Sequence, residues 1–131
     1  MNVISAKFSE NMKSFGKHYH DAHQMIYVKE GRIRVRIENE EYEAGSGSLV
    51  ILSRFEEHSI DVLTSQYKRY SVVISPETTT SDIDEYILST ILTNRFEGFS
   101  HVVDLVGNRE IKCFFEEMAL EFSKKASFYK F

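Results

Sequence analysis

Hydrophobic and polar residues alternate along residues 24–37, and Gly31 divides this stretch into two runs. In the second run, apolar side chains at the odd positions alternate with arginines at the even positions. Because successive side chains of a β-strand point to opposite faces, this period predicts two strands with an apolar face. A turn at Asn39-Glu40 would place Arg36 opposite Glu43. We therefore expect the arginines to form a charged outer face rather than a surface that binds nucleic acid.

Two further apolar segments, residues 49–52 and 67–74, predict additional strands. The single proline, Pro76, ends this β region. Apolar residues then recur at helical spacing, which predicts a helix over residues 82–93. A short extended piece is expected over residues 101–105 before the chain returns to a helical pattern.

The last segment of the chain predicts a second helix with Asn108 as its N-terminal cap. Its apolar side chains form a broad stripe of Ile111, Phe114, Phe115, Met118, Leu120 and Phe122. We expect this stripe to pack on the β region and against a second subunit, which would make the protein a homodimer. Cys113 lies in the same segment, where a buried, unreactive thiol is more common than a nucleophile.

The expected fold is therefore mainly β, with an antiparallel β-barrel over residues 1–76 and two α-helices in an extension over residues 77–131. A chain of 131 residues with 42% hydrophobic content is long enough to bury a substantial core. The formal net charge is −4 and the basic residues are dispersed, so we do not expect this chain to bind DNA by itself.

The two ends of the sequence give expectations about the cellular location of the protein and about whether the chain is a fragment. No apolar run is long enough to span a membrane, and residues 1–10 lack the continuous apolar core of a signal peptide. A cytoplasmic location without membrane contact is the resulting expectation. Residues 108–131 carry no helix-stop signal, so we expect the chain to be a fragment of a longer protein.

Candidate chemistry is concentrated in three histidines and a glutamine. His18, His20 and Gln24 are all even-numbered, so they would project from one face of an extended segment, and His58 follows later. Polar groups in an otherwise apolar row are typical of the inner wall of a small barrel that carries a binding site. His23 and His101 are expected to be surface side chains.

Two sets of residues resemble the motifs of the cupins. The first set is Gly16, His18, His20, Gln24 and Gly31, and the second is Gly47, Ser53, Phe55 and His58. Three residues depart from the cupin pattern. Gln24 replaces the metal-binding glutamate, Ser53 replaces a proline, and Phe55 replaces a glycine.

Taken over most of its length, the chain resembles the sensor domain of AraC-type transcription regulators more than a cupin enzyme. The resemblance implies a cupin-like jelly roll that binds a small effector at His18, His20, Gln24 and His58. It also implies that DNA is bound only through a domain absent from this chain. The first alternative is a metal-dependent cupin enzyme, an oxygenase or isomerase. The second is a structural module whose barrel is empty.

A metal centre would use His18, His20 and His58 as ligands, with the amide oxygen of Gln24 as an optional fourth. Several neutral imidazoles that converge on one point suit zinc, nickel, iron or manganese. An amide brings no negative charge and compensates a divalent cation less well than a carboxylate does. The sequence leaves open whether these residues bind a metal or form hydrogen bonds to a polar small molecule.

Overall fold

The computed structural model describes residues 3–10, 12–18, 21–74 and 100–128, which form nine strands and one helix. The strands are β1 (Val3–Glu10), β2 (Phe15–His18), β3 (His23–Glu30), β4 (Ile33–Ile37), β5 (Glu40–Ala44), β6 (Ser48–Leu52), β7 (His58–Val62), β8 (Lys68–Ile74) and β9 (Val102–Asp104). The helix is α2 (Arg109–Phe128). The strands predicted from two-residue periodicity and the extended piece before the helix are confirmed. The predicted helix over residues 82–93 lies outside the described residues.

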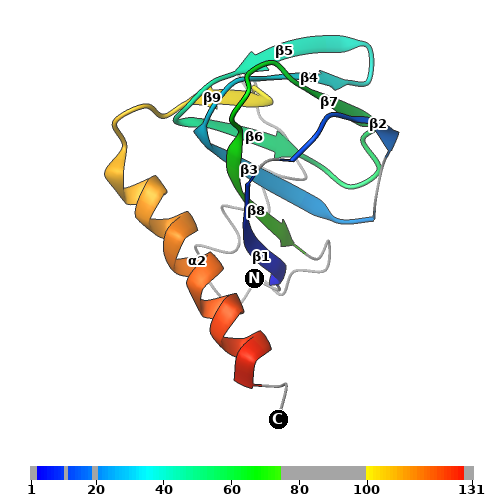
Figure 1. The fold of residues 1–131 in the computed structure, drawn as a ribbon. Coiled ribbons are helices and arrows are strands. Elements are labelled where there is room, and N and C mark those ends of the chain that lie inside the picture. The colour runs from blue at the N-terminus through cyan, green and yellow to red at the C-terminus, as the bar shows by residue number, and fades with distance from the viewer. Residues whose placement is uncertain (1–2, 11, 19–20, 75–99, 129–131) are drawn as a thin grey trace.

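The strands form two separate antiparallel sheets. One has the order β1-β8-β3-β6-β9, and the other has the order β2-β7-β4-β5. The two sheets face each other, and α2 runs along the outside of the five-stranded sheet, beside β1 and β8 (Figure 1). The expected closed barrel is therefore wrong for the described strands. They form a sandwich, held together by side chains packed between the sheets instead of by a continuous ring of backbone hydrogen bonds.

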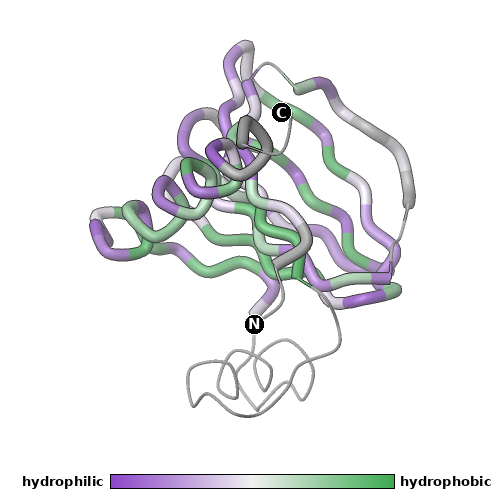
Figure 2. The backbone as a smooth tube through the Cα atoms, turned by 90° about the horizontal axis from the view of Figure 1, so that it is seen from below, coloured by the Kyte–Doolittle hydropathy of each residue, from purple (hydrophilic) through white to green (hydrophobic). Residues whose placement is uncertain are grey.

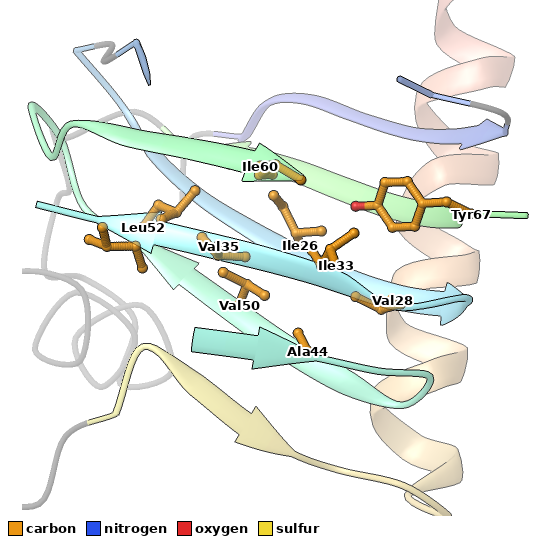
Figure 3. Packing of buried hydrophobic residues seen from close by; sticks show 10 residues of the cluster. Ile26, Val28, Ile33, Val35, Ala44, Val50, Leu52, Ile60 and Tyr67 are labelled. Carbon is orange, nitrogen blue, oxygen red and sulfur yellow. The ribbon is translucent and has the colours of Figure 1, made fainter. Parts of the chain in front are cut away.

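Alternate residues from both sheets form one apolar interior. Its buried members are Ile26, Val28, Ile33, Val35, Ile37, Ala44, Val50, Leu52, Ile60 and Tyr67. Figure 3 shows these side chains directed toward one another between the sheets. The alternation of hydrophobic and hydrophilic residues is visible along several strands (Figure 2). Removing this apolar area from water is the main contribution that holds the two sheets together.

The hairpin of β4 and β5 turns at Glu38-Asn39. Its register places Arg36 opposite Glu41, so the predicted turn at Asn39-Glu40 and the predicted pair with Glu43 are wrong. A two-residue hairpin turn requires positive φ, and residue 38 adopts φ 53°. Arg36 and Glu41 still form an exposed ion pair, with Nη2 and Oε2 3.5 Å apart, so the expected charged outer face is present.

The helix α2 covers the outer face of the five-stranded sheet. Asn108 caps it, because its Oδ1 accepts a hydrogen bond of 3.1 Å from the backbone N–H of Ile111. Phe115 is 2% exposed and stacks on Tyr27 of β3, with ring centroids 5.5 Å apart. The other helix side chains that pack on this face are Ile111, Met118, Ala119 and Phe122.

Part of the predicted helix stripe does not face the sheet. Phe114 and Leu120 are 36% and 55% exposed. Cys113 is also exposed, so the expectation of a buried thiol is wrong. The reason is geometric, since one sheet can cover only one side of a helix. Pairing of two subunits through this helix stays a prediction. Within the described residues, no helix combines the length and apolar character needed to cross a bilayer.

Candidate ligand-binding site

Two of the predicted site residues, His18 and Gln24, belong to different sheets. His18 ends β2 in the four-stranded sheet, whereas Gln24 lies near the start of β3 in the five-stranded sheet. The expectation that His18, His20 and Gln24 project from one face of a single strand is therefore wrong. The side chain of His18 and all of His20 lie outside the described residues.

The fold nevertheless brings three of the predicted positions to one end of the sandwich. Gln24 pairs with Leu52 at the end of β6, and residues 53–57 connect that end to His58 at the start of β7. The backbone of His18 pairs directly with His58. A connection of five residues keeps the ends of β6 and β7 close together. Gln24 and His58 thus lie on opposite sheets at the same end.

The side chains of Gln24 and His58 face the interior. Gln24 shares its strand face with the buried residues Ile26 and Val28, and His58 shares its face with Ile60. Both polar residues are buried, with 8% and 2% exposure. The predicted polar group in an otherwise apolar wall is therefore present at these two positions.

Gln24 is held by a buried hydrogen bond between the strands. Its amide nitrogen Nε2 donates to Oγ of Ser71 on β8, over 2.7 Å. Ser71 is 2% exposed. Since the amide nitrogen is fixed in this way, the amide oxygen is the group of Gln24 that can accept a hydrogen bond from a ligand or coordinate a cation.

His58 is fixed through Nδ1, which lies 2.9 Å from the backbone oxygen of Glu56. A carbonyl oxygen can only accept, so Nδ1 carries the proton in this contact. A metal would then bind Nε2, which is the usual arrangement for a histidine whose other nitrogen donates to a carbonyl. Among the described side chains, no group of three His, Cys, Asp or Glu residues gathers around one point. Because His18 and His20 complete the predicted set, the metal centre stays a prediction.

The polar part of the interior also includes three residues in and just before β8. Tyr67, Arg69 and Ser71 alternate with Tyr70 and residues 72 and 74, which belong to the apolar cluster under α2. Tyr67 and Ser71 contact the interior, and by strand alternation Arg69 faces the same way. Arg69 is 6% exposed. A positive charge is therefore buried between the sheets.

Burial raises the pKa of Tyr67, and the positive charge of Arg69 acts in the opposite direction. The phenol is neutral at physiological pH, since its ordinary pKa is already 10.0. A polar contact with the Arg69 side chain also acts to lower the pKa of Tyr67. By distance and angle, the Tyr67 hydroxyl makes no well-formed hydrogen bond to any described residue.

Sequence analysis did not identify Arg69 or Ser71 as site residues. They alternate with Tyr70, Val72 and Ile74, and this pattern by itself marks only the side of these three apolar residues as buried. In the structure both faces of β8 are buried: Tyr70, Val72 and Ile74 belong to the cluster under α2, and Arg69 and Ser71 on the other face are 6% and 2% exposed. The hydrophobic pattern of the sequence gives no sign that the polar residue Ser71 is buried.

The two histidines expected on the surface are both partly or fully enclosed around the 53–57 connection. His23 is 4% exposed, and its Nδ1 accepts a hydrogen bond of 3.2 Å from the backbone N–H of Arg54. His101 has Nε2 3.7 Å from Oε2 of Glu56, and its side chain is 15% exposed. The expected surface positions are wrong because the connection folds over both rings. These contacts fix the loop that precedes His58.

Phe55 adopts a backbone conformation that favours glycine. Its φ is 62°, its side chain is 53% exposed, and the guanidinium of Arg54 lies 4.8 Å from its ring centroid. A non-glycine residue in the left-handed region costs about 1–2 kcal/mol. This is the position at which the sequence departs from the glycine of the cupin motif.

The backbone of Phe55 supports a first prediction. Phe55→Gly is expected to be more stable than Phe55→Ala by about 1 kcal/mol, because glycine alone relieves the left-handed conformation. Urea denaturation of both variants measures the difference. Leu63 is exposed and has no positive φ, so Leu63→Ala should be more stable than Leu63→Gly. If the alanine variant were the more stable one at position 55 as well as at position 63, the assigned backbone strain at Phe55 would be contradicted.

Two facing antiparallel sheets that share an apolar core define a β-sandwich domain. The chain belongs to the family described as the AraC-like ligand binding domain, whose model matches residues 5–125. No curated protein matches the chain.

The chain is similar to several solved structures at low sequence identity, and those with TM-scores above 0.5 share its fold. A predicted oxalate decarboxylase from Thermotoga maritima is 17% identical, with a TM-score of 0.52 over 56% of this chain and 68% of that one. A Bacillus halodurans protein is 16% identical, with a TM-score of 0.51 over 60% and 67% of the two chains. A conserved protein of unknown function from Streptococcus pyogenes is 21% identical, with a TM-score of 0.45 over 55% of this chain. The match covers 59% of the Streptococcus protein, less than two thirds of its length.

Proposed function

We propose that this chain is the effector-sensing domain of an AraC-type transcription regulator, and that it binds a small molecule between its two sheets. The binding site would include Gln24 and His58, together with His18 and His20. Membership of the ligand-binding family supports this function. The observation that carries it is the buried pair of Gln24 and Ser71 on the inner side of the five-stranded sheet.

A polar group in this position is difficult to explain by stability alone. Aliphatic side chains could fill the same space without the desolvation cost of an amide and a hydroxyl. Ligand sites combine an apolar wall with a few fixed polar groups, which is the combination found at this end of the sandwich.

The bound molecule would act by favouring one arrangement of the domain over another, since a ligand with equal affinity for two states shifts neither. In a regulator of this type, DNA would be bound by a different domain. Pairing of two copies through the helical part belongs to the same proposal, and the exposed side chains of α2 available for it are Phe114 and Leu120.

Thermal denaturation of the chain with sugars, organic acids, amides and amines tests the proposed function. A true ligand at a hundredfold excess over its Kd should stabilise the domain by about 2.7 kcal/mol. Gln24→Leu should weaken that ligand at least about tenfold, because a fixed polar contact is lost. Arg36→Met changes an exposed residue on the outer face and serves as the control. Absence of stabilisation by every class, or equal affinity of the Gln24 variant, would contradict the proposal.

A further inference from the structure

The interior beside β8 combines a buried positive charge with a buried hydroxyl. Arg69 is 6% exposed and Tyr67 is 1% exposed. The hydroxyl oxygen of Tyr67 points back between the sheets, on the side of Ile60 and Ile33 (Figure 3). By distance and angle the hydroxyl makes no well-formed hydrogen bond to a described residue, and its polar contact with Arg69 leaves the O–H free to donate. The Tyr67 hydroxyl is therefore directed into the apolar interior, and its O–H can donate a hydrogen bond to a ligand.

The chemistry of these two side chains selects an anion with oxygen acceptors. A phenolic hydroxyl donates one hydrogen bond, and a guanidinium has five N–H donors, more than one protein group normally occupies. A carboxylate offers two acceptor oxygens in a plane that matches the guanidinium.

The surroundings of the pair select the rest of the ligand. Tyr67 belongs to the interior cluster, whose other members are aliphatic, and Arg69 lies opposite Val28 on β3. A ligand that reached Arg69 and Tyr67 with its acidic group would place its remaining atoms against this aliphatic wall.

We propose that the effector of this domain is a small organic acid with an apolar body, whose carboxylate binds Arg69 and accepts a hydrogen bond from Tyr67. This inference rests on the proposed function, because it names the chemical class of the molecule sensed in the same interior. It assigns Arg69 and Tyr67 as specificity-determining residues in addition to Gln24 and His58.

Calorimetric titration of the full 131-residue chain tests the charge requirement. The probes are butyrate and benzoate, with butyramide and benzamide as neutral molecules of nearly the same shape. The carboxylates are expected to bind at least about tenfold more tightly than the matching amides, because a charge-assisted hydrogen bond is stronger than a neutral one. Equal binding of acid and amide would overturn the inference and leave the proposed function standing.

Two interior variants and one control test the assigned residues. Arg69→Met should weaken carboxylate binding about tenfold to a hundredfold, and Tyr67→Phe about threefold to tenfold. Arg36→Met makes the same change on the outer face and should leave binding unaltered. Unchanged carboxylate affinity in both interior variants would contradict the assignment.

The unliganded stability of Tyr67→Phe gives a readout that does not depend on any probe. Removing a buried hydroxyl without a hydrogen bond should raise Tm by about 2–4 °C. A lower Tm would show that the hydroxyl already has a partner in the fold and would contradict the inference. Failure of both carboxylates to bind at millimolar concentration would contradict it as well, whereas the proposed function fails only if the wider range of compounds also gives no ligand.

Discussion

Replacing Phe115 with alanine is expected to destabilise the domain by about 3–5 kcal/mol, the range for truncation of a buried phenylalanine. The ring is 2% exposed and stacks on Tyr27, and it belongs to the cluster between α2 and the outer face of the five-stranded sheet. Its loss leaves a cavity at the centre of this contact. Urea denaturation monitored by circular dichroism measures the change in free energy of unfolding.

The neighbouring Phe114 provides a matched control, because it is the same residue type on the same helix but is 36% exposed. Its ring contacts Phe115 edge to face, with centroids 5.3 Å apart. Phe114→Ala should therefore cost about 1 kcal/mol, the value of an aromatic pair. Similar losses in both variants would mean that α2 does not pack on the sheet through Phe115.

The positions of most strands could be predicted because their periodicity is local. Strands β3, β4, β6 and β8 were each expected from alternating or continuous apolar runs, and the cap at Asn108 from a single residue. Periodicity does not show which other strand or helix packs against each face of a strand. The hairpin register moved by two residues, since it depends on where the turn adopts positive φ.

The same limit explains the candidate site. His58 and Gln24 were expected to belong to one site, and the fold places both in the interior at one end of the sandwich. The prediction that Gln24 and His18 lie on one strand was wrong, because β2 and β3 belong to different sheets. Spacing along the chain specified the residues, whereas sheet topology determines how they come together.

Arg69 shows most clearly why a strand pattern can conceal a site residue. On β8 the apolar residues Tyr70, Val72 and Ile74 face α2, so the polar side of the strand resembles a solvent-exposed face in the sequence. That side is buried as well, since Arg69 and Ser71 are 6% and 2% exposed. When both faces of a strand are buried, the sequence pattern identifies only the apolar face. The burial of the polar face becomes evident only from the packing of the layers in three dimensions.

Gly31→Ala is expected to cost about 2–5 kcal/mol, from the sum of a left-handed backbone and a steric clash. Gly31 lies between β3 and β4 with φ 96°, and a Cβ atom there would overlap the backbone oxygen of Gln66. Backbone cannot move aside as a flexible side chain can. The segment that carries Gln66 leads directly into Tyr67, so the clash would also displace the phenol from the interior. The free energy of unfolding in urea measures the loss.

Gly107 separates the two contributions to this effect. It also has positive φ, 82°, but no atom lies within 4 Å of the position of its Cβ. Gly107→Ala should therefore cost only the backbone term of about 1–2 kcal/mol. The excess loss at Gly31 then measures the clash with Gln66. Equal losses at the two glycines would show that the chain around Gln66 relaxes freely, and the close approach of this loop to the start of β4 would then have no role in fixing Tyr67.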